Sequence, residues 1–421
     1  MAISGRMQLS RKRPNTHEMN ATQRETILQR WNVVQHELMP QLRAELDGLT
    51  PRLERVIHTL EWVRVEEFTD SSSDEIGRPP HERAWLANAF VAKAVLGLTT
   101  TVALIERLTV DRALRRICGF AMCRKLPSEA TFSRAFAEFA KSGLAERAHE
   151  ALIEEHLGDR IIGHLSRDAT AIESRERPQY TPKPEVSTGP AAQGSLIPAP
   201  DAAPSPARGS AGVARGNAPK RGIGNRGAAK RAAKARARKR QPVLRQRSQD
   251  LEQMIEELPT ACDRGTKSNA QGYKDSWNGY KAHIDTADCG VPISVLVTSA
   301  SMHDSRAAIP LSLISAQRVT NLYDVMDAAY CSAQIHEHCR ELGHVPLIDH
   351  NPRGGAKEEF EPADAIRYNE RTAAERTNAR LKDEFGGRNV RVRGHDKVSS
   401  HLMFGILALS ADQFTRLYRR E

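Results

Sequence analysis

The feature that most constrains the fold of this chain is a change in composition near its middle. From Glu176 to about Arg247 the sequence consists mainly of Pro, Ala, Gly and Arg, and fourteen Lys or Arg but no acidic residue lie between Ala207 and Arg247. Such a segment has too little apolar surface to offset the entropy lost on ordering. We therefore predict a disordered basic insert at about 176–258, with folded segments on both sides of it.

The segment before the insert is predicted to be helical. Apolar residues recur at steps of three and four in "RAWLANAFVAKAVLGL" and "TVALIERLTVDRALRRICGF". In "LPSEATFSRAFAEFAKSGL" the same spacing turns Phe132, Phe136 and Phe139 inward, and Ser128 fits an N-cap. We expect helices over residues 20–158 and assign 1–158 to a helical N-terminal domain. The last of these segments is compatible with a helix–turn–helix that enters a DNA groove. It is equally compatible with helices that only pack inside the protein.

The remainder alternates between β-rich and helical runs. "RIIGHLSRDATAIES" predicts a strand closed by Asp168, and "NLYDVMDAAYCS" a strand ending near Asp327. "YKAHIDTA" and "VPISVLVTSA" flank the turn "DCG" and predict a hairpin, and "HVPLIDHN" predicts a further strand. Helical runs follow the hairpin and separate the later strands. This order predicts an α/β fold over residues 159–421, a mixed sheet flanked by helices and interrupted by the insert.

The charge of the chain indicates its class of partner. Its formal net charge of +10 and pI of about 9.4 favour a polyanion, with nucleic acid ahead of a membrane surface. No run approaches the ~18 apolar residues of a membrane helix, and the N-terminus lacks the apolar centre of a signal peptide. We expect a cytoplasmic protein with no membrane contact. The basic insert fits a DNA-binding arm and a solvated linker equally well.

Three carboxylates stand at positions where a metal site would be built. Asp168 and Asp327 are expected at strand ends, and Glu375 on a later helix. Carboxylates brought close together repel one another unless a cation neutralises them, and hard oxygen ligands suit Mg²⁺ or Mn²⁺. Two such ions can activate an attacking hydroxyl and stabilise both oxygens of an in-line phosphoryl displacement.

A polar stripe accompanies the third carboxylate. In "YNERTAAERTNARLK", Tyr368, Arg371, Glu375 and Lys382 stand at i, i+3, i+7 and i+14, on one face of a helix. The alternative is structural, because Arg371 and Glu375 also form an exposed i,i+4 pair worth about a few tenths of a kcal/mol. The strand-end aspartates favour the functional interpretation over this one.

A second motif, "HDS" at His303, Asp304 and Ser305, follows the second strand of the predicted hairpin. Its polar side chains fit either a helix cap or a place beside the predicted site. The cap is the better fit, because a helical run begins immediately afterwards.

Several segments together resemble one protein family. The stripe matches the pattern Y-x2-R-x3-E-x6-K, which is the signature of a group of bacterial insertion-sequence DDE transposases. "SRDATAIES" and "YDVMDAAYCS" are similar to the strands that carry that group's first and second aspartates. "WNGYKAH", "TSASMHDS" and "VRVRGHDKVSSHLMFGILAL" also resemble segments of these enzymes. The resemblance covers about residues 80–421, apart from the insert.

The resemblance implies a fold, an activity and a set of roles. The fold would be RNase H-like, Asp168, Asp327 and Glu375 would bind two Mg²⁺ or Mn²⁺ ions, and the other three stripe residues would contact DNA: Tyr368, Arg371 and Lys382. The activity would be cleavage at element ends and strand transfer into target DNA. The helical N-terminal domain would bind the ends, and a homodimer or larger assembly would form the synaptic complex. The alternatives are a metal-dependent nuclease without strand transfer and a non-enzymatic DNA-binding protein.

Overall fold

The computed structural model describes residues 49–69, 82–120, 125–178, 242–268, 272–352 and 356–418. The helix expected over residues 20–48 and the greater part of the basic insert, residues 179–241, lie outside these ranges.

The N-terminal region is helical, as predicted. Its elements are α3 (Pro51–Val63), η2 (Val65–Phe68), α4 (Arg83–Val95), α5 (Thr101–Val110), α6 (Arg112–Ile117), α7 (Glu129–Ser142) and α8 (Leu144–Leu157). Thr50, Thr100 and Asp111 cap the helices they precede, each accepting a hydrogen bond from a backbone N–H three residues on. Ser128 holds the N-cap position of α7, but its hydroxyl bonds to that of Thr131 instead of capping the backbone.

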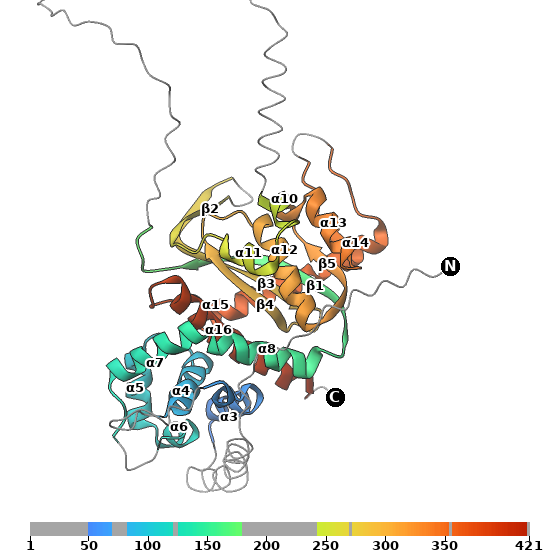
Figure 1. Cartoon of the computed structure of the whole chain (residues 1–421). Coiled ribbons are helices and arrows are strands. Elements are labelled where there is room, and N and C mark those ends of the chain that lie inside the picture. The colour runs from blue at the N-terminus through green and yellow to red at the C-terminus, as the bar shows by residue number, and fades with distance from the viewer. Residues whose placement is uncertain are drawn as a thin grey trace, which may run out of the picture.

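The C-terminal helix α16 (His395–Tyr418) joins the N-terminal helices to the sheet. It packs against α3, α4, α7 and α8 on one side and against strand β4 (Pro292–Ser299) on the other (Figure 1). Phe404 of α16 meets Phe90 and Phe136, with ring centroids 5.8 and 6.1 Å away. Phe132, Phe136 and Phe139 are all buried, as the spacing predicted. The regions before and after the insert therefore share one hydrophobic core.

The sheet is mixed. Its strands are β1 (Ile161–Glu173), β2 (Asp263–Ser268), β3 (Lys274–Ala287), β4 (Pro292–Ser299), β5 (Thr320–Met326) and β6 (Val345–Ile348). The strand order is β2–β3–β1–β5–β6, with β4 paired to β3. β3 is antiparallel to β1, β2 and β4, whereas β5 is parallel to β1 and β6. The expected β3–β4 hairpin is confirmed, and β2 is a strand that the sequence did not predict.

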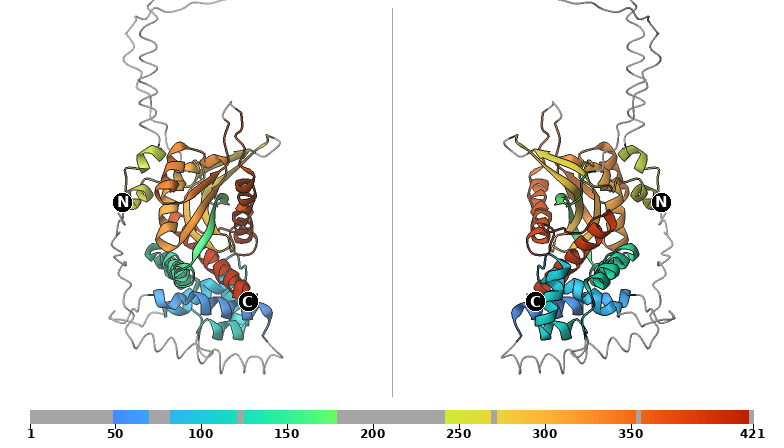
Figure 2. Two further views of the ribbon diagram at one scale, coloured as in Figure 1. Left: turned by 90° about the vertical axis from the view of Figure 1, so that its right-hand side faces the viewer. Right: turned by 90° about the vertical axis from the view of Figure 1, so that its left-hand side faces the viewer.

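Helices cover both faces of the sheet. One face carries α12 (Ser305–Arg318) and α13 (Ala333–Glu341), and the other carries α15 (Thr372–Asp383) (Figure 2). The short elements η3 (Ala328–Tyr330), α14 (Pro362–Tyr368) and η4 (Asn369–Arg371) connect them. This is the mixed α/β, RNase H-like arrangement that the sequence predicted, following a helical N-terminal region. No helix in the described ranges has the length and apolar character needed to cross a membrane.

The expected end of the basic insert is wrong. Residues 242–258, predicted to be disordered, contain α10 (Pro242–Gln246) and α11 (Leu251–Glu256). Val243 and Met254 are buried in a cluster with Ile309 of α12. These few apolar side chains are sufficient because α12 and α13 already offer a surface for them, which composition alone does not reveal.

Candidate active site

The two predicted aspartates lie side by side at one edge of the sheet. The parallel ladder between β1 and β5 ends with the pair Arg167 and Met326. Asp168 follows Arg167 in β1, and Asp327 follows Met326 at the end of β5. Neighbouring strands lie about 4.8 Å apart. The structure therefore brings these two carboxylates together at the carboxyl end of the parallel ladder.

One local expectation for Asp168 is wrong. The sequence predicted that Asp168 closes its strand, but β1 continues to Glu173. It continues because β3 remains paired with it beyond the end of β5, up to the pair of Glu173 with Gly279. Asp168 thus lies inside a strand, held by the β3 ladder, while Asp327 has already left β5.

Both aspartate side chains are oriented by hydrogen bonds. Asp168 Oδ2 accepts a bond of 2.9 Å from the side-chain amide of Asn378 on α15. Asp327 is the N-cap of η3, where its Oδ1 accepts a bond of 2.9 Å from the backbone N–H of Ala329. The Ser166 hydroxyl donates to the Glu370 carbonyl oxygen at 3.4 Å. This bond links β1 to η4, the short element that precedes α15. The carboxylates therefore have defined positions in the protein itself.

Charge at this edge favours a cation. Burial raises the pKa of Asp168, and the negative charge of Asp327 raises it further. Burial also raises the pKa of Asp327, with an added contribution from Asp304. The positive charges of Arg371 and Lys267 lower both pKa values and so partly compensate. Two crowded oxygen ligands of this kind fit a hard divalent ion.

The helix that carries the polar stripe is interrupted. Residues 368–382 comprise the end of α14, the 3₁₀ turn η4 and then α15. A 3₁₀ turn advances about 120° per residue, so residues i and i+3 lie directly above one another, and Tyr368 stays on the side of Arg371, whose guanidinium carbon lies 5.9 Å from the centroid of its ring. The Tyr368 ring packs on Phe360 with centroids 4.8 Å apart, and burial raises its pKa to about 12.

Glu375 is bound to Arg371 in this structure. Arg371 Nη2 donates to Glu375 Oε1 at 2.6 Å, and the Glu375 side chain is 49% exposed. The i,i+4 pair that was the structural alternative is therefore present. Among the residues described, no group of three or more His, Cys, Asp or Glu is placed to hold a metal ion. The aspartates are brought together, and the participation of Glu375 stays a prediction.

Lys382 extends a group of cations beside Asp168. It is half-buried, and its pKa is lowered by burial and then by the positive charges of Arg388 and Lys267. Sequence reasoning missed Lys267, because β2 was not predicted, and Arg388, because it lies in a loop. Asn378 was also missed, although it stands three residues after Glu375 and therefore on its helix face.

The "HDS" motif divides between the two roles considered for it. The backbone N–H of Ser305 donates to His303 Nδ1 at 3.3 Å, so His303 bonds the start of α12. Asp304 occupies the N-cap position but makes no side-chain capping bond. It accepts a bond of 2.8 Å from Lys281 Nζ instead. The cap expectation thus holds for His303, while Asp304 pairs with Lys281 instead of capping α12.

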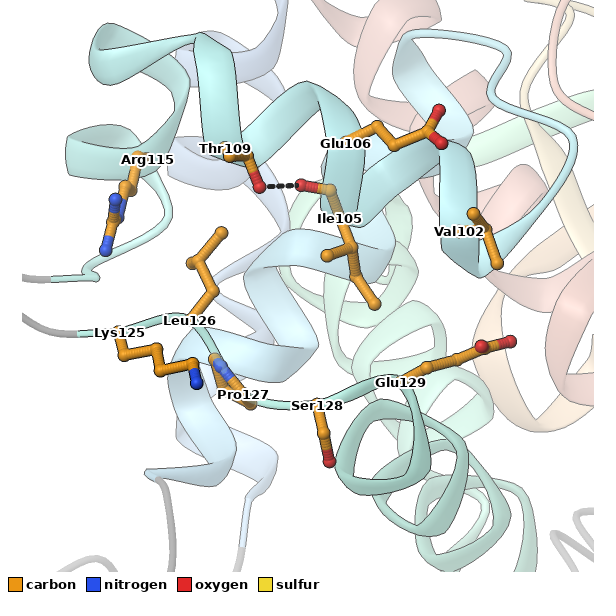
Figure 3. Close-up of a pocket in the computed structure, with 10 residues that line it drawn as sticks. All are labelled: Val102, Ile105, Glu106, Thr109, Arg115, Lys125, Leu126, Pro127, Ser128 and Glu129. Atoms are coloured by element: carbon orange, nitrogen blue, oxygen red, sulfur yellow. Dashed lines mark hydrogen bonds between the residues drawn. The ribbon is translucent and has the colours of Figure 1, made fainter.

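A separate hollow of about 520 Å³ lies among the N-terminal helices, between α5, α6 and the start of α7 (Figure 3). Val102, Ile105 and Leu126 give it an apolar lining, and Lys125 and Glu129 lie at it. It contains none of the residues at the sheet edge. The hollow therefore plays no part in the geometry of the two aspartates.

Two transposase family models match parts of this chain. The transposase DDE domain matches residues 257–411, and a second family, the transposase domain (DUF772), matches residues 40–138. The first range contains Asp327, Glu375 and the whole stripe, and the second contains most of the N-terminal helices. Searches of curated proteins and of solved structures found no match.

The fold and the match over residues 257–411 support an RNase H-like DDE domain, a kind of domain that acts on DNA. Together, the two matches support a DDE transposase of the bacterial insertion-sequence type. Enzymes of this family act with divalent metal ions, and the adjacent carboxylates of Asp168 and Asp327 fit that requirement.

Proposed function

We propose that this transposase cleaves DNA at the ends of its own element and joins the freed 3′-hydroxyls to target DNA at one site. Asp168, Asp327 and Glu375 would be its catalytic residues. The observation that carries the proposal is the end of the β1–β5 ladder, which leaves two partly buried carboxylates adjacent.

The same geometry supports the proposed metal ligands. Asp168 and Asp327 would hold Mg²⁺ or Mn²⁺, with Glu375 as the third ligand and two ions in the complete site. When bound, such ions activate the attacking hydroxyl and stabilise the entering and leaving oxygens of the displacement. Asn378 and the backbone N–H of Ala329 keep the two aspartates oriented throughout.

Glu375 has to exchange partners to take this role. Its bond with Arg371 is an exposed i,i+4 pair, which is worth only about a few tenths of a kcal/mol. A DNA phosphate is a better partner for Arg371, because a phosphate offers several charged oxygens to the guanidinium fork. Binding of DNA would therefore release Glu375 while placing Arg371 on the backbone next to the scissile phosphate.

Three residues of the polar stripe would bind the DNA backbone: Tyr368, Arg371 and Lys382. Lys267 and Arg388 add positive charge beside Lys382. Contacts of this kind set register and affinity without reading sequence. The N-terminal helical domain would bind the element ends, and two or more copies would assemble around them in the bacterial cytoplasm.

A plasmid assay tests the proposal against its alternatives. The full chain is incubated with Mg²⁺ and a supercoiled plasmid that carries the element's own terminal repeats, with a second plasmid as target. Cleavage at the repeats and joined products are expected, and Asp168→Asn is the inactive control. Cleavage without joining would favour a metal nuclease, and binding without cleavage would favour a non-enzymatic DNA-binding protein.

A further inference from the structure

A two-stranded ribbon extends from one end of the sheet. β1 ends where Glu173 pairs with Gly279. Beyond that point β3 continues with β2, and their pairs run from Asp263 with Gly279 to Ser268 with Lys274 (Figure 2). A two-stranded ribbon by itself is only marginally stable in water. Its two faces differ in how they answer this weakness.

One face, the back face, stiffens the ribbon. Gly265 and Trp277 are directly opposite each other, and the indole lies across the glycine, because a Cβ at Gly265 would be 2.4 Å from the Trp277 ring. Trp277 Nε1 donates to the Tyr280 carbonyl oxygen at 3.1 Å, which fixes the ring. The next pair on this face sets Lys267 opposite Asp275. The back face therefore combines an aromatic contact with charges of both signs.

The other face, the front face, is polar and exposed. Two cross-strand pairs form it, Arg264 with Asn278 and Thr266 with Ser276, and all four side chains are exposed. The two hydroxyls lie 3.2 Å apart and bond each other. Lys274 follows on the same face as a second exposed cation. None of these five positions holds an acidic residue.

This set of side chains matches the chemistry of a DNA groove. The major groove of DNA admits a two-stranded β-ribbon. Arg can make two hydrogen bonds to guanine O6 and N7, Asn can make two to adenine N6 and N7, and Ser or Thr can bond either base. A ribbon that is only solvated is served by mixed charges, as on the back face, whereas a face with cations and no acid is complementary to a polyanion.

The front face lies on the same side of the sheet as Asp168. Asp168 pairs with Ile284, and alternation along β3 brings Asn278 and Ser276 to that side. This is also the side that α15 covers. The Ser174 N–H donates to the Asn278 carbonyl oxygen at 2.9 Å. At about 3.3 Å per residue along β1, the front face therefore begins about 20 Å from Asp168, the length of about six base pairs.

The proposed backbone contacts lead toward the ribbon. After burial, the charges of Arg388, Lys267 and Glu173 all act on the pKa of Lys382 near the end of α15. Lys267 belongs to the ribbon, and Glu173 is the last residue of β1. A duplex that follows α15 from Arg371 to Lys382 therefore continues onto the ribbon.

We propose that the β2–β3 ribbon reads base edges in the major groove of the element end, through Arg264 and Asn278, about six to eight base pairs from the cleaved phosphate. The inference rests on the proposed function, in which cations beside α15 hold the DNA backbone. It adds a surface that reads sequence to contacts that set only register and affinity.

Fluorescence anisotropy tests this role by comparing two duplexes, one of the element's own end and one of scrambled sequence with the same length and composition. Arg264→Ala should lower the affinity of the full chain for the element end about 10- to 100-fold and that for the scrambled duplex much less, because only the correct base accepts both hydrogen bonds. Asn278→Ala should act in the same direction. Arg264→Lys keeps the charge without the planar fork, so it should bind the scrambled duplex normally and still lose the preference.

Matched controls come from the helices on the opposite side of the sheet. Arg340→Ala removes an exposed cation of α13 and Gln317→Ala an exposed amide of α12, and neither should change the preference. Thermal unfolding of each variant confirms that it is folded.

Methylation protection locates the contact, because dimethyl sulfate attacks guanine N7 in the major groove. The native chain should protect a guanine about six to eight base pairs from the cleavage site. Arg264→Ala should lose that protection while the rest of the footprint remains.

Three results would overturn the inference. Equal losses on both duplexes would make the ribbon a phosphate contact, no loss on either would remove it from the DNA, and a full return of the preference in Arg264→Lys would reduce Arg264 to a charge. Cleavage by the native chain separates these failures from failure of the proposed function. If the native chain cleaves at the element ends while the ribbon variants keep its preference, only the inference fails. If the native chain neither cleaves nor prefers the ends, the proposed function is wrong, and the inference with it.

Discussion

Two arginine–carboxylate pairs flank Asp168 on opposite faces of the sheet, and they differ in burial and in the number of hydrogen bonds that join them. Arg167 bonds both oxygens of Asp285 at 2.7 Å, with the two side chains 2% and 0% exposed. Arg371 bonds one oxygen of Glu375 at 2.6 Å, with the side chains 25% and 49% exposed. One pair is enclosed between the sheet and α12, and the other lies on the surface of a helix.

The contrast separates a fixed element of the site from an exchangeable one. Burial alone would lower the pKa of Arg167, but the Asp285 carboxylate raises that pKa above its ordinary value, so Arg167 stays charged. Arg167, on β1, also donates to the sulfur of Met326 on β5 at 3.6 Å, one residue before the two aspartates. With its bonds to Asp285 on β3, it therefore joins three neighbouring strands. The exposed pair lacks these additional contacts, so Glu375, the proposed third ligand, is the side chain that can move.

Breaking the buried pair should have the largest effect. Asp285→Asn leaves Arg167 charged and without its partner, which should lower the free energy of unfolding by about 3–5 kcal/mol. Denaturant unfolding measures this loss. A double change, Arg167→Met with Asp285→Leu, removes both charges and should recover much of the stability. A cost of about 0.5 kcal/mol for Asp285→Asn would show that the two pairs do not differ as described.

Neutralising an aspartate should sacrifice activity but not stability. Asp168→Asn or Asp327→Asn should reduce cleavage by at least about a hundredfold, the loss typical of removing a group that acts on the transition state.

Because burial raises the pKa values of both aspartates, the folded protein binds protons more tightly than the unfolded chain does. The stability that these groups contribute is complete below about pH 4 and is lost as pH rises through the raised pKa values.

The pH dependence of unfolding tests that sign. Relative to the double variant with both aspartates replaced by Asn, the native protein should lose stability as pH rises above about 4. Thermal unfolding at a series of pH values, without metal, measures the difference. A difference that stays constant or grows in favour of the native protein would mean that its aspartates are not destabilised by burial.

Removing one proposed phosphate contact should have a moderate effect that depends on salt. Lys382→Ala should weaken end-binding, and the slope of log affinity against log salt should fall by about one unit. Fluorescence anisotropy over a range of salt concentrations gives both quantities. Arg340→Ala, which removes an exposed cation of α13 on the opposite face of the sheet, is the control and should keep the native slope. An unchanged slope for Lys382→Ala would remove it from the DNA surface.

The exposed pair should contribute least to stability. A double-mutant cycle on Arg371 and Glu375 should give a coupling of about 0.3–0.5 kcal/mol in the DNA-free protein. Denaturant unfolding of the two single variants and the double variant provides it. A coupling above about 2 kcal/mol would mean that Glu375 is fixed by Arg371 and cannot exchange partners.

The sequence predicted most of the sheet because its strands carry local signals. The runs around Asp168 and Asp327 are β-rich and their order allows a parallel pair, so two of the three carboxylates could be placed near each other. The extent of β1 could not be predicted, since it depends on how far β3 remains paired. Contacts between elements distant in sequence, such as Lys281 with Asp304, have no local signal at all.

The helix bearing Glu375 shows a different limit. Spacing placed Arg371 and Glu375 on one face, which is confirmed, but it could not detect the 3₁₀ turn that interrupts the helix between Tyr368 and Thr372. Spacing is equally compatible with an ion pair and with a ligand beside a phosphate contact. Only the state of the protein, free or bound to DNA and metal, decides between them.

Glu375→Gln therefore tests the central claim most directly. End-binding and Mg²⁺-dependent cleavage are measured side by side for this variant and the native chain, using the same terminal-repeat DNA. The account predicts that Glu375→Gln loses cleavage while it binds the ends as well as the native protein, or slightly more tightly because a negative charge near phosphate is gone. If Glu375→Gln still cleaves at the native rate with Mg²⁺, Glu375 is only the partner of Arg371, and the proposed site is wrong.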